Sequence, residues 1–162
     1  MRIQTVFGTV LALALAATPG CDDPFEPEAG PRIFVATLSG DVFTPPVEGV
    51  SGIAELVYVD TALVYMVDVA GLDSISAAHV HLSDPDRSDP LLAHLCCGGS
   101  IPVGAAPVAE GSLFAGVTGV SVDSIMNVLR AGIGFVDVHT RARPAGALRG
   151  ALLPAGIVPA GT

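Results

Sequence analysis

The stretch that decides the fold is residues 52–70, Gly-Ile-Ala-Glu-Leu-Val-Tyr-Val-Asp-Thr-Ala-Leu-Val-Tyr-Met-Val-Asp-Val-Ala. Two runs rich in β-branched and aromatic residues, 52–59 and 63–70, flank the dipeptide Asp60-Thr61. Such runs are typical of strands, and a break of this length is typical of a hairpin turn. The stretch therefore predicts two neighbouring antiparallel strands.

Short apolar stretches broken by Gly, Pro, Asp and Ser continue on both sides of this hairpin. We expect strands over 33–39, around His79–His81, and over 91–95, 113–117, 133–140 and 147–153. Pro45-Pro46 keeps the segment before the hairpin out of a regular ladder, and residues 102–110 are small and expected to be flexible. Turn signals at about ten-residue spacing predict an all-β fold, a single antiparallel β-sandwich or barrel-like domain.

One short helix is expected at about 122–131. Ser121 or Asp123 can cap its start, and apolar side chains at 125, 128 and 129 have helical spacing. Gly132 is expected to end it.

The composition indicates one acidic domain. The chain has 162 residues, 51% of them hydrophobic, a formal net charge of −9, and only arginine among its basic residues. This length suits one domain rather than two. An acidic chain without a basic patch argues against nucleic acid as a partner and against electrostatic docking on anionic lipid.

The N-terminus resembles an export signal. Arg2 precedes an apolar run of twelve residues, 6–17, which is too short to span a bilayer comfortably. Residues 1–20 are therefore predicted to be a signal peptide of the bacterial lipoprotein type, with Cys21 as the lipidated residue. Thr18 departs from that pattern, which usually has Leu there; the alternative is cleavage after Ala16, which leaves Cys21 a free thiol. Both alternatives predict export; membrane contact is expected only through the lipid anchor of the first.

The remaining boundaries follow from composition. Residues 21–32 are acidic and proline-rich and are predicted to form a tether. The domain covers 33–153, and 154–162 is expected to be a flexible tail. Cys96 and Cys97 are adjacent, so in an oxidising compartment they could form a disulfide, have a redox or metal role, or simply be two small residues in a Gly-rich loop.

Histidines and one aspartate form the candidate site. His79 and His81 leave the same face of their strand, and so do Asp137 and His139, because side chains repeat every two residues. If the two strands are neighbours, three imidazoles and a carboxylate could converge, a set that suits Zn²⁺ or Cu²⁺. The alternative is a structural network, in which the histidines bond backbone, Asp137 or Arg149 and hold the two strands together. His94 stands alone in the sequence.

A second polar residue of interest is Arg149. It could orient an anion, but such an arginine more often pairs with a carboxylate, here Asp68 or Asp137. We therefore place Arg149 and Asp68 in a structural polar network.

The order of several motifs resembles the CHRD domain, the module named after chordin and also found in exported bacterial proteins. The motifs are Phe34-Val35-Ala36-Thr37-Leu38-Ser39-Gly40, Pro45-Pro46, Gly52-Ile53-Ala54, Ala78-His79-Val80-His81, Phe135-Val136-Asp137-Val138-His139-Thr140 and Pro144-Ala145-Gly146-Ala147-Leu148-Arg149-Gly150. The family commonly has Tyr, Asn and Glu where this chain has Phe135, Asp137 and Ala147, and losing that Glu removes a partner for Arg or His. The resemblance implies a β-rich exported domain; in chordin the module belongs to an extracellular antagonist of growth factors.

No catalytic residues are predicted, because no Gly-x-Ser-x-Gly elbow, phosphate loop, dinucleotide fingerprint or Cys-x-x-Cys occurs. The chain is thus expected to be a non-enzymatic binding or structural module of the cell envelope without a cofactor, its partner an unidentified protein or envelope component. The alternative is a Cu- or Zn-binding envelope protein that uses His79, His81 and His139. Redox chemistry like that of copper-zinc superoxide dismutase ranks last, because that enzyme's long zinc loop has no counterpart in residues 83–88.

Overall fold

The central hairpin forms as its sequence predicts. The computed structural model describes residues 30–86, 88–97 and 108–155, and in it β2 (Ser51–Val59) pairs with β3 (Ala62–Ala70) along their whole lengths. The turn residue Asp60 has φ 54°, a left-handed conformation that Asp adopts more readily than most residues. The polar turn and the two β-branched runs therefore specify the hairpin together.

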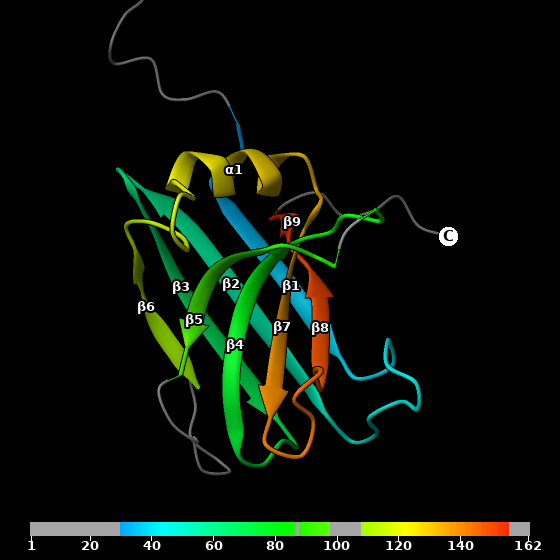
Figure 1. Ribbon diagram of the computed structural model, residues 1–162. Coiled ribbons are helices and arrows are strands. Elements are labelled where there is room, and N and C mark those ends of the chain that lie inside the picture. Colours follow the sequence, from blue (N-terminus) through cyan, green and yellow to red (C-terminus); the bar gives the residue numbers. More distant parts are fainter. Residues whose placement is uncertain (1–29, 87, 98–107, 156–162) are drawn as a thin grey trace, which may run out of the picture.

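Antiparallel pairing extends the hairpin into one sheet that nearly closes on itself (Figure 1). The order is β5-β4-β7-β8-β1-β2-β3-β6, with β9 also on β1. The other strands are β1 (Ile33–Ser39), β4 (Ile75–Leu82), β5 (Leu91–Cys96), β6 (Ala109–Leu113), β7 (Gly134–Thr140), β8 (Leu148–Ala151) and β9 (Leu153–Pro154). At the seam between β5 and β6, Val117 donates its backbone N–H to the carbonyl of Leu92 (2.8 Å). The expected all-β, barrel-like class is confirmed.

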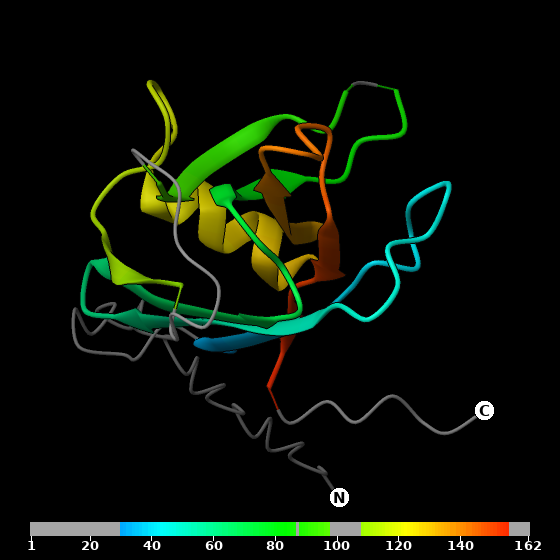
Figure 2. The ribbon, with the colours of Figure 1, turned by 90° about the horizontal axis from the view of Figure 1, so that it is seen from below.

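Alternate side chains of the strands fill the barrel, and a helix covers one end. Phe34, Leu56 and Val80 are fully buried members of this core. Helix α1 (Val122–Arg130) lies across the end of the barrel (Figures 1 and 2) and buries Ile125 and Leu129. The predicted helix at about 122–131 is thus confirmed.

The helix ends are as the sequence suggests. Of the two capping candidates the structure uses Ser121, whose Oγ accepts a hydrogen bond from the Ser124 N–H (3.1 Å). Gly132 follows the helix with φ 69°, a conformation that glycine adopts at little cost.

The strand expected over 113–117 is wrong, because the strand lies earlier, at β6. It pairs with β3 from Leu63 opposite Leu113 to Val67 opposite Ala109. Local β-propensity did not predict β6, because β6 contains small and polar residues. The segment forms a strand because it pairs with β3. A Cβ at Gly111 would lie 2.7 Å from the Tyr65 hydroxyl oxygen, so this position leaves room for the Tyr65 ring. Of the segment 102–110, expected to be flexible, residues 102–107 lie outside the described residues.

The C-terminal end of the domain also differs from the expectation. The segment 147–153 forms two short strands rather than one: β8 pairs with β7 and β1, and β9 pairs with β1. Pro154 belongs to β9, and Ala155 donates its N–H to the Ile33 carbonyl (2.8 Å). The described part of the expected tail is therefore hydrogen-bonded to β1.

The expected signal peptide, Cys21 and most of the tether lie outside the described residues. Within the described ranges, no helix has the length and apolar character needed to cross a bilayer.

Candidate metal centre

The four candidate ligands lie on two neighbouring strands, on the outer face of the barrel. β4 pairs with β7 so that His79 stands opposite Asp137. Because paired residues share a face and side chains alternate, His81 and His139 project on that face as well. Their inward neighbours, including Val80 and Val138, are fully buried in the core. Because these neighbours face the core, the alternation of side chains along each strand points the histidines away from the core.

Three imidazole nitrogens surround one carboxylate oxygen. Asp137 Oδ1 lies 2.9 Å from His139 Nε2, 3.3 Å from His81 Nε2 and 3.7 Å from His79 Nδ1. His79 Nδ1 and His139 Nε2 are 3.2 Å apart. The four ligand atoms all lie within 4.8 Å of one another. Ligands about 2 Å from one ion lie at most about 4 Å apart, so the most widely separated atoms would have to move together by under about 1 Å to hold a single ion.

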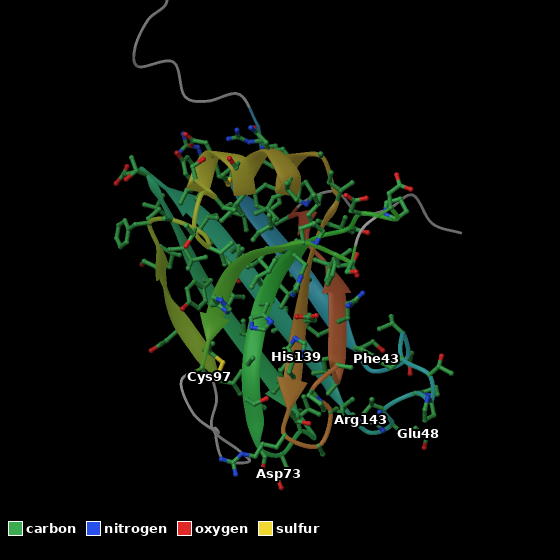
Figure 3. The ribbon with its side chains drawn as sticks, viewed as in Figure 1. Phe43, Glu48, Asp73, Cys97, His139 and Arg143 are labelled. Atoms are coloured by element: carbon green, nitrogen blue, oxygen red, sulfur yellow. A yellow bond between two sulfur atoms is a disulfide. The ribbon has the colours of Figure 1, made fainter. Side chains whose placement is uncertain are left out.

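Backbone carbonyls hold two of the rings in place. His81 Nδ1 lies 2.7 Å from the Asp89 carbonyl oxygen, and His139 Nδ1 lies 3.0 Å from that of Pro144. A carbonyl only accepts, so each Nδ1 carries its hydrogen, and each Nε2 faces Asp137. His139 lies on β7, beside β4 (Figure 3). In metal sites, histidine ligands are typically oriented in this way, by a hydrogen bond from the ring nitrogen that does not bind the metal.

Asp137 is buried, with 3% of its side chain exposed. Burial alone would raise its pKa, but the contacts from His139 and His81 outweigh burial and hold the pKa well below its usual range. The site therefore contains an ionised carboxylate that needs cationic neighbours, which can be protonated imidazoles or a metal.

The three histidines have different proton affinities. Burial, aided by the nearby His139, lowers the pKa of His79 to about 4. Burial also lowers the pKa of His81, but Asp137 and the Asp89 carbonyl outweigh it, so the net shift is upward. The hydrogen bond to Asp137 raises the pKa of His139 despite burial. His79 is thus neutral near neutral pH, whereas Asp137 favours the protonated forms of His81 and His139.

Arg149 bonds Asp137 from the other side. It stands opposite Asp137 on β8, with Nη2 3.5 Å from Asp137 Oδ2 and Nη1 3.1 Å from Asp89 Oδ2. Its guanidinium lies over the Phe135 ring at 4.2 Å, an arrangement that cation–π attraction favours. Of the two partners expected for Arg149, Asp137 is thus in contact.

Asp68, the other partner, is not in contact with Arg149. It lies on β3, opposite Ile53 of β2, and β3 is three strands away from β8 in the sheet order. The partner that sequence reasoning missed is Asp89, from the loop after β4. Its sequence signal, an acidic residue eight positions after His81, was too weak to single it out.

His94 is also closer to the site than its isolation in sequence suggests. It stands opposite His79 on β5, and their rings meet edge to face with centroids 4.9 Å apart. His94 is exposed and is not one of the four converging residues.

The cysteines lie apart from this cluster. Cys96 and Cys97 form a disulfide at the end of β5, and neither is one of the four converging residues. Cys21, the predicted lipidation site, lies outside the described residues.

The donor set suits a borderline transition metal. Three imidazole nitrogens and one carboxylate oxygen provide four ligands, as Zn²⁺ prefers in tetrahedral sites, and imidazole also suits Cu²⁺. The side chains of His79, His81 and His139 are 15–18% exposed, so the open side of the site is reachable from solvent.

Comparison with protein families gives one match, the CHRD domain, over residues 34–152. Comparisons with curated proteins and with solved structures gave no match. The family match covers most of the chain, including the whole of β4 and β7, which carry the histidine cluster, and of β8, which carries Arg149; β9 lies outside it. The chain therefore belongs to the CHRD domain family.

Proposed function

We propose that this CHRD domain is a binding module that holds one Zn²⁺ or Cu²⁺ ion through His79, His81, His139 and Asp137. The observation that carries the proposal is the convergence of four ligand atoms within 4.8 Å of one another. Asp137 supplies a charged oxygen, and the imidazoles supply the nitrogens that such ions bind. No catalytic role is proposed for the ion.

A purely structural network explains less of this geometry. It accounts for the carbonyl contacts of His81 and His139, but it leaves the buried His81 Nε2 with a 3.3 Å ion-pair contact to Asp137 Oδ1 and no hydrogen bond. Buried polar atoms in folded proteins are nearly always paired. A metal at the centre of the cluster would give this nitrogen a partner.

Export and anchoring form a second part of the proposal. CHRD domains occur in extracellular proteins, and the residues before the domain resemble a lipoprotein signal. We infer that the chain is exported to a bacterial envelope and carries lipid on Cys21, with an unidentified protein or envelope component as its partner. We expect Cys21→Ser to release the protein from the membrane fraction. If the variant stays in that fraction, the inference of a lipid anchor on Cys21 is wrong.

Elemental analysis tests the metal. The full-length chain is loaded with Zn²⁺ or Cu²⁺, desalted and measured; we expect one equivalent per chain. His139→Ala should reduce the content to a small fraction of an equivalent, because it removes a ligand.

His94→Ala is the matched control, since it removes an exposed imidazole beside the site and should leave the content unchanged. Absence of metal from the wild-type chain, or equal loading of the wild type and His139→Ala, would contradict the proposal. If metal is absent and His79→Ala lowers the melting temperature, the cluster is structural instead.

A further inference from the structure

The outer face of β2, β3 and β6 carries a groove that the metal centre does not use. The groove has a volume of about 540 Å³, and its exposed apolar floor includes Val64 and Met66. It lies on the other side of the barrel from β4 and β7, as the end-on view shows (Figure 2). Exposed apolar surface bounded by polar groups is typical of interaction sites.

Two carboxylates border this floor. Met66 on β3 stands opposite Glu55 on β2 and opposite Glu110 on β6, so the three residues form one row across three strands. Because neighbouring strands are about 4.8 Å apart, the two carboxylates are anchored about 10 Å from each other. In the described part of the chain, neither glutamate has an ion pair or a side-chain hydrogen bond.

The charges and the spacing define the occupant. We propose that the groove binds an extended peptide segment with two basic side chains four positions apart and an apolar side chain midway between them. Because side chains of an extended chain alternate between two faces, these three side chains all face the groove. The basic residues are anchored about 13 Å apart, and their long flexible side chains can reach the two glutamates while the apolar side chain contacts Met66. A second copy of this chain fits less well, because its net charge of −9 gives like-charge repulsion.

Binding of a synthetic peptide to the full-length chain tests this proposal. The probe is a fluorescein-labelled peptide with Lys-Ser-Leu-Ser-Lys at its centre, measured by fluorescence anisotropy at low ionic strength. We expect saturable binding that salt weakens, and no binding of the Glu-Ser-Leu-Ser-Glu counterpart. The double variant Glu55→Gln/Glu110→Gln should weaken binding roughly fivefold, as the loss of two exposed ion pairs predicts.

Glu48→Gln is the matched control. This exposed glutamate lies in the loop before β2, on the far side of the molecule from β6 (Figure 3), and its removal should not change binding. Unaltered binding by the double variant, or absence of binding by the wild type, would overturn the proposal. A wild-type dimer in sedimentation that Met66→Ser dissociates would assign the groove to a second copy and overturn it too.

Discussion

Asp137 is the residue on which the site depends. A buried carboxylate is costly unless charges or hydrogen bonds compensate it, and here Arg149 bonds Oδ2 while three imidazoles face Oδ1. Without a metal, protons on His81 and His139 provide the compensation. A metal would replace these protons, so its binding should release protons near neutral pH.

The pH behaviour of the metal-free chain follows from these contacts. His79 has its pKa lowered to about 4, whereas those of His81 and His139 are raised above 6.5. The neutral His79 thus stabilises the fold above pH 6.5, and this contribution is lost as the pH falls towards 4. The contributions of His81 and His139 are present below pH 6.5 and are lost as the pH rises through their folded pKa values.

Nuclear magnetic resonance titration of the imidazole Cε1 protons measures these pKa values one by one. The signal of His79 should move last as the pH is lowered, and those of His81 and His139 should move first. Titration of all three at one ordinary value would show that the rings do not interact with Asp137 as described.

Asp89 is predicted to position the ligands. Its carbonyl accepts from His81, and its carboxylate bonds the arginine that contacts Asp137. Asp89→Asn keeps a side chain that tolerates the φ of 38° but weakens the Arg149 bond. We expect Zn²⁺ affinity to fall about tenfold, as for other outer partners of metal ligands, measured by competition with a chromophoric chelator.

The exposed Asp86 in the same loop provides the control, and Asp86→Asn should bind as the wild type does. Equal affinities for the Asp89 and Asp86 variants would mean that the loop does not orient the ligands.

Sequence reasoning reached the four converging residues because they obey a two-residue repeat, which is a local property. It did not reach Asp89, whose role depends on how a loop folds back over β4. It also paired Arg149 with Asp68, because a charge pattern alone does not say which carboxylate is near.

At the scale of elements, the pairing of β4 with β7 creates the cluster. The repeat places His79 with His81, and Asp137 with His139, but it does not determine that these strands are neighbours, since they are separated by more than fifty residues. That adjacency comes from the barrel order, in which β7 lies between β4 and β8. A shift of one residue in either strand would turn its ligands into the core.

Helix α1 is predicted to depend on its cap. Ser121→Ala removes the side-chain acceptor of the Ser124 N–H, so the free energy of unfolding in urea should fall by about 1 kcal/mol. Ser121→Asp keeps an acceptor and should restore most of the loss. If both variants unfold alike, the side-chain cap contributes nothing to stability.

At the scale of the whole molecule, the barrel separates two outer surfaces. Apolar side chains fill its interior, the histidine cluster lies over β4 and β7, and the acidic groove lies over β2, β3 and β6. The fold class could be predicted because turn residues and β-branched runs recur along the whole chain. The position of β6 could not, because its pairing with β3 depends on the closure of the sheet rather than on its own propensity.

The central claim is that the histidine cluster binds the metal, and X-ray absorption at the zinc edge of the loaded chain tests it most directly. We predict a first shell of nitrogen and oxygen at about 2.0–2.1 Å with the outer-shell scattering of three imidazoles. A sulfur shell at about 2.3 Å, or an oxygen shell without imidazole scattering, would contradict the claim.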